Sequence, residues 1–198
     1  MTSGIRAFIA VELSVEIKAE LTRIQTVLKR DASCPIRWVT SDSTHLTLCF
    51  LGELNQGQIE AVKAVMGRIG GSFSPLQLRL SALGVFPQAA QMRTIWVGLD
   101  GERNILSGIH RHLEEGLSVM GYQPELRPFR PHLTLARVPS EASPTSCIEL
   151  GAAMRRINVT PLVVGITELS LMKSTLSPTG AIYTRLYRVG LTGVVPNA

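Results

Sequence analysis

Two copies of one histidine-containing word are the part of this sequence best suited to chemistry. The tetrapeptide His-Leu-Thr-Leu begins at His45 and again at His132, 87 positions later. With average residue usage, a second copy arises by chance with a probability on the order of 10⁻³. Histidine changes charge close to neutral pH, so one ring can act as a general base while another acts as a general acid. The repeat therefore predicts one site that uses both histidines.

Each word also predicts a β-strand that presents its polar residues on one face. Side chains alternate along a strand, so His45 and Thr47 point one way and the neighbouring leucines point the other way. His132 and Thr134 repeat this arrangement. Two such pairs around one phosphorus atom would place base and acid on opposite sides, with the threonine hydroxyls bonded to phosphate oxygens. The pattern indicates in-line displacement at a phosphodiester.

Other kinds of catalytic site are poorly supported. Two histidines are too few for a catalytic zinc site, which normally takes three protein ligands, and no GxSxG motif is present. His110 and His112 stand two apart in a predicted helix, so they do not share a face and we interpret them as solvated. Cys49 falls on the predicted His45 face, but its counterpart is Ala136, so we interpret it as packing. We expect no metal and no cofactor.

Length, charge and cysteine content set the broad class. A chain of 198 residues can bury a substantial core. The net charge of +5 favours a polyanionic partner such as nucleic acid, although solubility alone would explain it equally well. Cys34, Cys49 and Cys147 have no CxxC spacing, which argues against a disulfide framework. Without a recognisable secretory signal or an apolar run of ~18 residues, we expect a monomeric cytoplasmic protein outside the membrane.

The predicted elements mix strands and helices, and several strands are joined by short turns. Short connections favour antiparallel pairing, so the pattern indicates an α+β fold, and the repeated word suggests a duplicated lobe. Ser14 and Asn55 are predicted helix caps, the latter with Gln58 as a capping box. Strands are predicted at 5–13, 36–40, 45–54, 76–86, 94–100, 131–138, 162–173 and 181–191, and helices at 15–30, 56–69, 102–120 and about 144–156.

Around the two words, the sequence resembles the two-histidine (2H) phosphoesterase superfamily, which is defined by two H-x-[ST]-φ motifs, where φ is apolar. It is most similar to the RNA 2′,3′-cyclic phosphodiesterase branch, historically called 2′-5′ RNA ligase. The stretches that carry this resemblance are RxFIA at Arg6–Ala10, RWV…HLTLCFLGEL from Arg37, GVFP…RxxWxG at Gly84–Gly98, FRPHLTLAR at Phe129–Arg137 and SxLxxxGxxYxxL at Ser174–Leu186.

The resemblance implies a bilobed, duplicated α+β fold, in which two antiparallel sheets form a central cleft and the helices lie outside. It implies that residues 1–198 form one 2H phosphoesterase domain with two pseudo-symmetric lobes. The implied activity is metal-independent hydrolysis of a terminal 2′,3′-cyclic phosphate on RNA, or of a cyclic nucleotide, to a 2′-phosphate. In that scheme His45 protonates the leaving 3′ oxygen, His132 activates water, Thr47 and Thr134 bind phosphate, and Arg137 helps to hold the substrate.

Phe129 and several arginines are further candidates for substrate contact. Phe129 is placed to stack on a base, although an apolar residue before a strand is as often part of the core. Strict alternation puts Arg137 on the opposite face from His132, so the strand ends or bulges near Ala136, or Arg137 reaches round its edge. We choose Arg93 and Arg130 from a set of candidates for an RNA-facing basic rim: Arg6, Arg37, Arg93, Arg127, Arg130 and Lys173.

Two other functions fit the same residues. A non-catalytic protein that binds RNA ends or nucleotides would bind oligonucleotides with a steep salt dependence and would not turn them over. Reversible 2′-5′ RNA ligation would use the same groups, because a catalyst accelerates both directions of a reaction. Turnover of a cyclic phosphate separates a hydrolase from a binding protein.

Overall fold

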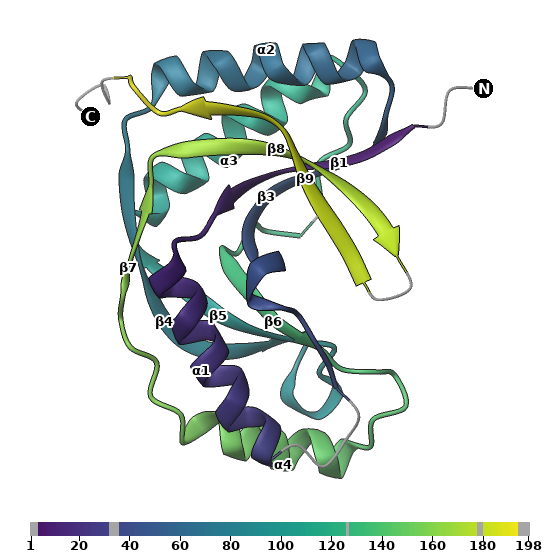
Figure 1. The fold of residues 1–198 in the computed structure, drawn as a ribbon, viewed down its shortest axis with the longest axis vertical. Helices are drawn as coiled ribbons and strands as arrows, with labels where there is room; N and C mark the ends of the chain where they lie inside the picture. The colour runs from purple at the N-terminus through teal and green to yellow at the C-terminus, as the bar shows by residue number, and fades with distance from the viewer. Residues whose placement is uncertain (1–3, 32–35, 126, 178–179, 194–198) are drawn as a thin grey trace.

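The computed structural model describes residues 4–31, 36–125, 127–177 and 180–193. These ranges contain four α-helices and nine β-strands (Figure 1). The helices are α1 (Val15–Asp31), α2 (Gln56–Ser72), α3 (Arg103–Ser118) and α4 (Pro144–Arg155), and η1 (Ser41–Ser43) is a 3₁₀ turn. The strands are β1 (Ile5–Glu12), β2 (Arg37–Trp38), β3 (His45–Leu54), β4 (Leu76–Phe86), β5 (Thr94–Gly101), β6 (His132–Arg137), β7 (Val163–Ile166), β8 (Glu168–Ser177) and β9 (Gly180–Gly190).

The strands form a curled antiparallel sheet whose two halves meet at one narrow seam. Its order is β7-β4-β5-β6-β3-β1-β8-β9, with β2 beside β6. We call the half with β3, β1, β8 and β9 lobe 1, and the half with β6, β5, β4 and β7 lobe 2 (Figure 1). At the seam, β3 and β6 share one registered pair among the described residues, Leu46 opposite Leu133. The predicted α+β fold with two antiparallel sheets is confirmed, and the seam joins them.

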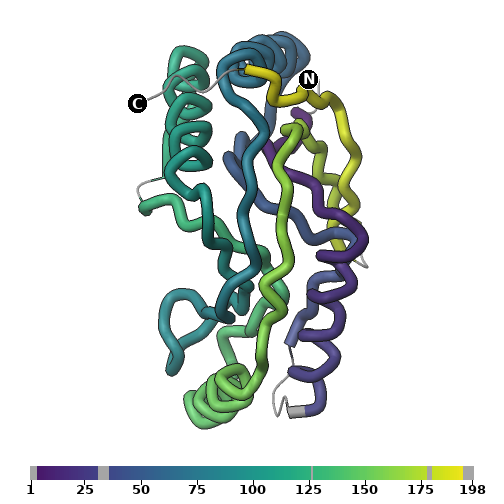
Figure 2. Tube along the Cα trace, turned by 90° about the vertical axis from the view of Figure 1, so that its left-hand side faces the viewer, coloured from purple at the N-terminus to yellow at the C-terminus, as the bar shows by residue number. Residues whose placement is uncertain are grey.

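The helices pack on one another in two pairs, one for each lobe. Helices α2 and α3 contact each other and strands of lobe 1, while α1 and α4 contact each other at the end of lobe 2 (Figures 1 and 2). Helix α1 follows a strand of lobe 1, yet its Gln25 Nε2 donates to the carbonyl oxygen of Leu135 in β6 at 2.9 Å. Helix α3 follows β5 of lobe 2 and contacts β3 of lobe 1. Because these helices cross between lobes, the apolar residues of both lobes share one core cluster.

Local signals explain where the helices begin and which face they bury. The backbone N–H of Ile17 donates to Ser14 Oγ at 3.5 Å, and the apolar positions of α1 recur at helical spacing and are fully covered. At the start of α2, Asn55 and Gln58 form the predicted capping box, in which each side chain accepts from the other residue's backbone N–H at 2.9 Å. Both predicted caps are confirmed.

One predicted strand was wrong. The stretch 162–173 is two strands separated at Thr167, because the chain passes there from lobe 2 to lobe 1. Strand β7 pairs with β4, whereas β8 pairs with β1. Figure 2 shows this yellow-green segment running along the molecule between the upper and lower helices. The predicted strand at 36–40 is shortened to the two residues of β2.

The remaining expectations concern thiols, turns and membranes. Cys49 and Cys147 are free and buried, while Cys34 lies outside the described residues. Strands β8 and β9 form a hairpin with Ser177 opposite Gly180, and the two residues predicted between them lie outside the described residues. In the part of the chain that the structure describes, no helix combines the length and the apolar character needed to cross a membrane.

Candidate active site

The two His-x-Thr pairs lie on one face of the sheet at the seam between the lobes. The two leucines of the seam pair are fully buried, so the residues on either side of each leucine point to the other face. Continuing this register places His45 opposite Thr134 and Thr47 opposite His132. The two histidines then occupy one diagonal, and diagonal neighbours on regular strands lie about 7–8 Å apart. This spacing leaves room for one phosphate group. We call this surface the site face.

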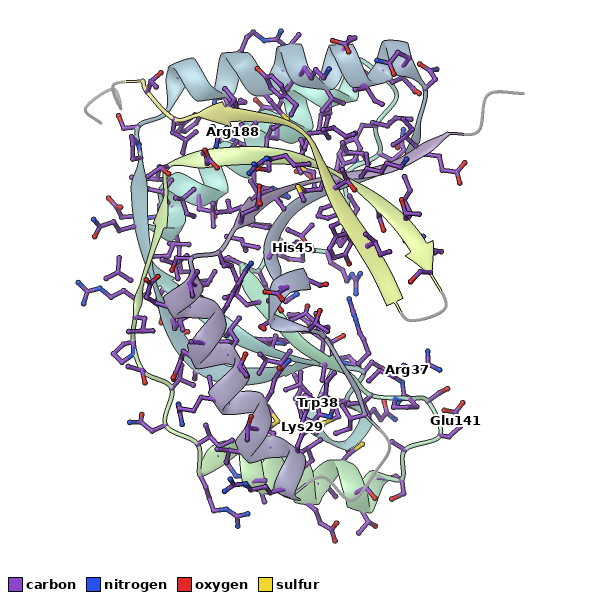
Figure 3. All side chains as sticks on the ribbon, in the orientation of Figure 1. Lys29, Arg37, Trp38, His45, Glu141 and Arg188 are labelled. Atoms are coloured by element: carbon purple, nitrogen blue, oxygen red, sulfur yellow. The ribbon has the colours of Figure 1, made fainter. Side chains whose placement is uncertain are left out.

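Each histidine ring is anchored in the same way. The Nδ1 atom of His45 lies 2.9 Å from the carbonyl oxygen of Ser43, and that of His132 lies 2.7 Å from the carbonyl oxygen of Arg130. A carbonyl oxygen only accepts, so Nδ1 carries a proton and donates it in both bonds. Nε2 is therefore the atom left for proton transfer in each ring. Figure 3 shows His45 near the seam, below the β8–β9 hairpin.

Aromatic rings from neighbouring strands fix the orientation of His45. The Phe8 ring of β1 stacks on the imidazole with centroids 4.6 Å apart and an angle of 27°. The Tyr183 ring of β9 meets the imidazole edge-on at 5.0 Å and 89°. Phe8 is buried on the site face in a small cluster with Ala10 and Met172. Because both rings come from strands of the sheet, these contacts favour one orientation of the imidazole ring.

A second pair of aromatic rings surrounds His132. Phe86 at the end of β4 meets the imidazole edge-on at 5.0 Å, and Trp96 of β5 lies 6.1 Å from it. Trp96 lies so close over Gly84 that a Cβ atom there would come within 2.2 Å of the indole ring. The glycine of the GVFP stretch is therefore needed for this indole to lie beside the histidine.

A β-bulge follows the threonine of each word at an equivalent place. On β3, Ala10 pairs with Thr47 and Ile9 with Cys49, so the residue between them has no partner on β1. On β6, the register against β5 likewise skips Leu135. An extra residue reverses the alternation that follows it. Cys49 therefore faces the core, so its predicted placement on the His45 face was wrong, while its interpretation as a packing residue is confirmed. Burial raises the pKa of its thiol to about 12.

The same bulge explains how Arg137 reaches the site. Its register partner on β5 is Thr94, which shares the site face with Trp96 two residues further along. Arg137 Nη1 donates to Thr94 Oγ1 at 2.8 Å. Of the alternatives left open for Arg137, the bulge near Ala136 is the one that the register shows. On β3 the equivalent position is Phe50, a ring that is 55% exposed on the site face and lies 6.3 Å from Phe8.

The threonines and the electrostatic surroundings complete the site. Within the described residues, neither the Thr47 nor the Thr134 hydroxyl has a hydrogen-bond partner, and both side chains are half-buried.

Burial lowers the pKa of both His45 and His132. For each ring, the hydrogen bond to a backbone carbonyl acts in the opposite direction and raises the pKa. Burial outweighs this hydrogen bond in both rings, so both pKa values lie below the ordinary value for histidine. No group of three or more His, Cys, Asp or Glu side chains in the described part is arranged to hold a metal ion.

A family model described as LigT-like phosphoesterase matches residues 11–96 and again residues 97–183, with one His-Leu-Thr-Leu word in each match. The chain belongs to this family. The predicted membership of the two-histidine phosphoesterases is thereby confirmed. The double match also agrees with the duplicated fold, since β1 and β3 of the first half correspond to β5 and β6 of the second half.

Relatives and solved structures agree with this assignment over nearly the whole chain. The RNA 2′,3′-cyclic phosphodiesterase of Methanothermobacter thermautotrophicus is 31% identical over 180 residues, covering 91% of this chain and 95% of that protein. The protein of the same name from Thermotoga maritima is 29% identical over 189 residues, covering 95% and 96%. The Thermus thermophilus protein TT0787 matches with a TM-score of 0.79 and 26% identity, and E. coli LigT complexed with 3′-AMP with 0.75 and 27%. Both structural matches cover 96% of this chain and 99% of the other chain.

Some residues that the sequence predicts as substrate contacts are engaged with other parts of the protein. The Phe129 ring stacks on His110 of α3 at 4.1 Å and 13°, which favours packing over base stacking. His110 was wrongly interpreted as solvated, because its side chain is 15% exposed and lies 3.5 Å from a Glu114 carboxylate oxygen. His112 is exposed, as expected. Arg93 donates to the carbonyl oxygen of Pro139 at 3.2 Å.

Three arginines of lobe 2 are exposed, namely Arg37, Arg130 and Arg137. Arg37 on β2 is the register partner of Arg137, and Figure 3 places Arg37 near Glu141. Arg130 is exposed and contributes its carbonyl oxygen to the His132 ring.

Sequence reasoning missed the residues that touch or flank the two rings. Phe8, Trp96 and Tyr183 stand in stretches that carry the family resemblance, yet no spacing rule assigned them to the histidines. Their roles depend on register between strands far apart in sequence. Glu12, opposite His45 on β1, was missed for the same reason.

Proposed function

We propose that this LigT-like phosphoesterase is an RNA 2′,3′-cyclic phosphodiesterase that hydrolyses a terminal 2′,3′-cyclic phosphate to a 2′-phosphate. The observation that carries the proposal is the pair of imidazole rings, each fixed through Nδ1 on one sheet face beside a threonine hydroxyl. Relatives of this name align over about nine-tenths of the chain, which supports the same reaction class. The protein is thus a phosphoric diester hydrolase.

In the proposed reaction the two histidines act on opposite sides of the phosphorus. His132 Nε2 accepts a proton from a water molecule while the water oxygen forms a bond to phosphorus. The bond from phosphorus to the 3′ oxygen breaks, and His45 Nε2–H donates its proton to that oxygen. The product is a 2′-phosphate with a free 3′-hydroxyl. Each ring returns to its starting state by proton exchange with solvent.

Three side chains are proposed to hold the phosphate during this transfer. The hydroxyls of Thr47 and Thr134 lie beside the two histidines, and Arg137 reaches the same face through the β6 bulge. Hydrogen bonds to oxygens that gain charge in the transition state stabilise it more than the ground state. Together they would hold the phosphorus between the two Nε2 atoms.

The remaining substrate contacts divide between the two lobes. The exposed ring of Phe50 offers an apolar surface for a base or sugar, while Arg93 and Arg130 are proposed contacts for RNA phosphates. The complex of E. coli LigT with 3′-AMP supports a nucleotide as ligand.

Since both histidines come from one chain, we propose that the monomer is active. We also propose a cytoplasmic site of action, in keeping with the free thiols of Cys49 and Cys147.

The proposal is tested by incubating the protein with 2′,3′-cyclic AMP and with an oligoribonucleotide that ends in a cyclic phosphate. The expected product is the 2′-phosphate isomer in both cases, identified by ³¹P NMR. Binding of the oligonucleotide without any turnover would identify a nucleic-acid-binding protein instead. Joining of two oligonucleotides through a 2′-5′ bond, without hydrolysis, would favour the ligase alternative.

A further inference from the structure

The two halves of the site differ at the position opposite each histidine. On β1 the register partner of His45 is Glu12, while on β5 the register partner of His132 is Gly98. Directly opposite residues on antiparallel strands share a face, with Cβ atoms about 5 Å apart. The Glu12 carboxylate therefore belongs to the site face beside His45. His132 has no side chain at the equivalent place.

The glycine on β5 cannot simply be exchanged for an acidic residue. A Cβ atom at Gly98 would lie 2.7 Å from Ser81 Oγ and 3.2 Å from the Trp96 ring. Ser81 and the indole that flanks His132 would therefore both have to shift to admit a side chain at this position. The difference between the two half-sites is part of how each is packed.

The Glu12 carboxylate is fixed by two hydrogen bonds from lobe 1. Ser170 Oγ on β8 donates to Glu12 Oε1 at 2.6 Å, and Arg185 Nη1 on β9 donates to the same oxygen at 2.9 Å. Burial opposes ionisation, but these bonds, with the charges of Arg185 and Lys18, hold the pKa of Glu12 below its usual range. The carboxylate is consequently ionised at neutral pH, and it is held on the site face.

The opposite charge stands beside the other histidine. Arg137 stands five residues after His132 on β6. The residue five positions after His45 on β3 is the uncharged Phe50. The Arg137 charge disfavours the protonated form of His132, and the Glu12 charge favours the protonated form of His45. Glu125 favours the protonated form of His132, but more weakly than Arg137 disfavours it. The dominant charged neighbours of the two rings therefore have opposite sign.

We propose that Glu12, held by Ser170 and Arg185, is a positioning residue that makes His45, rather than His132, the proton donor of the pair. The inference rests on the proposed cyclic phosphodiester hydrolysis and deepens it. A symmetric pair of histidines has no intrinsic direction, so either ring could attack through water and the other protonate a leaving oxygen. A carboxylate on one side and a guanidinium on the other fix that direction.

Several other charged or titratable groups surround this arrangement. Lys18 of α1 acts on Glu12 and lies 4.0 Å from Asp42 of η1. Tyr183 of β9 touches the His45 ring. Further along β8 and β9, Glu168 and Arg188 form their own ion pair at 3.5 Å. That pair lies on the same two strands, so it supplies a matched control.

The test follows the protonation of each histidine by NMR titration of the free protein. Glu12→Gln keeps the shape of the side chain and removes its charge, so the His45 midpoint is expected to fall while the His132 midpoint stays. Arg185→Met removes the charge that offsets Glu12, so the His45 midpoint is expected to rise. Glu168→Gln breaks the neighbouring ion pair and is expected to leave both midpoints unchanged.

Rate measurements with cyclic-phosphate-ended RNA complete the test. At alkaline pH, kcat/KM of Glu12→Gln is expected to fall several-fold, because the fraction of protonated His45 is smaller there. At acidic pH it should match the wild-type value. The inference is overturned if Glu12→Gln leaves the His45 midpoint unchanged, or if Glu12→Gln and Arg185→Met move it in the same direction. Absence of turnover by the wild-type protein would overturn the proposed function, which the titrations do not measure.

Discussion

Leu135 of β6 has no partner on β5, and this bulge determines which face of the sheet Arg137 lies on. Because the register against β5 skips Leu135, Arg137 lies beside Thr94 on the site face, five residues after His132. Simple alternation places it on the wrong face, and the sequence around it carries no separate sign of a bulge. The histidines and threonines precede the bulge, so alternation predicts their common face correctly.

Arg137→Met is expected to lower kcat/KM by about 10²-fold, as the loss of a charged donor to the transition-state phosphate typically does. The same change should raise the pKa of His132, because the positive charge of Arg137 lowers it. Steady-state rates and an NMR titration measure the two effects. Arg137→Lys is the control, since it keeps a charge and should leave the His132 pKa closer to its wild-type value. Unchanged rates in Arg137→Met would remove Arg137 from the site.

At the scale of elements, the sequence predicted the bounds of a helix or strand wherever residues within that element or its cap determine them. Strands β3 and β4 begin and end where the alternation predicts, and Asn55 with Gln58 begins α2. The break at Thr167 was not predictable in this way. The stretch around it is continuously apolar enough for one strand, and the break reflects a change of partner from β4 to β1. Pairing between distant strands leaves no local mark.

Helix α1 is tied to the segment before β7 by one buried carboxylate. Glu20 Oε2 accepts from Arg23 Nε at 2.7 Å, and Glu20 Oε1 accepts from the Thr160 backbone N–H at 2.9 Å. Arg23 Nη2 also donates to the Asn158 carbonyl oxygen at 2.8 Å. The hydrogen bond from Arg23, above all, lowers the pKa of Glu20 to about 2. This carboxylate therefore stabilises the fold in its ionised form.

Glu20→Gln is expected to lower the free energy of unfolding by about 1–3 kcal/mol at pH 7, since it weakens bonds to a buried group. The wild-type carboxyl has a pKa below its unfolded value, so its contribution is complete above about pH 4.5 and is lost as the pH falls through about 2. Urea unfolding of the wild-type protein and Glu20→Gln at pH 7 and at about pH 2 measures the difference in stability and its loss in acid. Glu60→Gln, which breaks the exposed pair with Lys63, should change stability by less than about 0.5 kcal/mol. Equal effects of the two substitutions would contradict the account.

At the scale of the whole molecule, the duplication is visible only once the strands are aligned by register. The sequence FIAVEL covers the end of β1 and the one residue after it, while β5 begins TIWVGL. Each of these strands pairs with a His-Leu-Thr-Leu word. Half the positions agree because they face the common core, while the others differ because they face the site. The core-facing pairs are Ile9/Ile95, Val11/Val97 and Leu13/Leu99, and the site-facing pairs are Phe8/Thr94, Ala10/Trp96 and Glu12/Gly98.

The seam between the lobes gives a prediction for the whole fold. Leu46→Ala and Leu133→Ala should each lower the free energy of unfolding by about 2–5 kcal/mol, because both side chains are fully buried opposite each other. The double variant should lose less than the sum, since one enlarged cavity serves both sites. Urea unfolding measures all three. Leu176→Ala, at a position 71% exposed on β8, is the control and should have little effect. Strict additivity of the seam pair would contradict direct coupling across it.

The most direct test of the central claim is the initial rate of hydrolysis of a cyclic-phosphate-ended oligoribonucleotide in excess EDTA. The wild-type protein and His112→Ala, which removes an exposed helix histidine, should hydrolyse it at equal rates that the chelator does not change. His45→Ala and His132→Ala should each lose about 10²–10⁴-fold in kcat, with unchanged circular dichroism and thermal midpoint. A wild-type rate in either of these two variants, or loss of wild-type activity to the chelator alone, would contradict catalysis by the paired histidines.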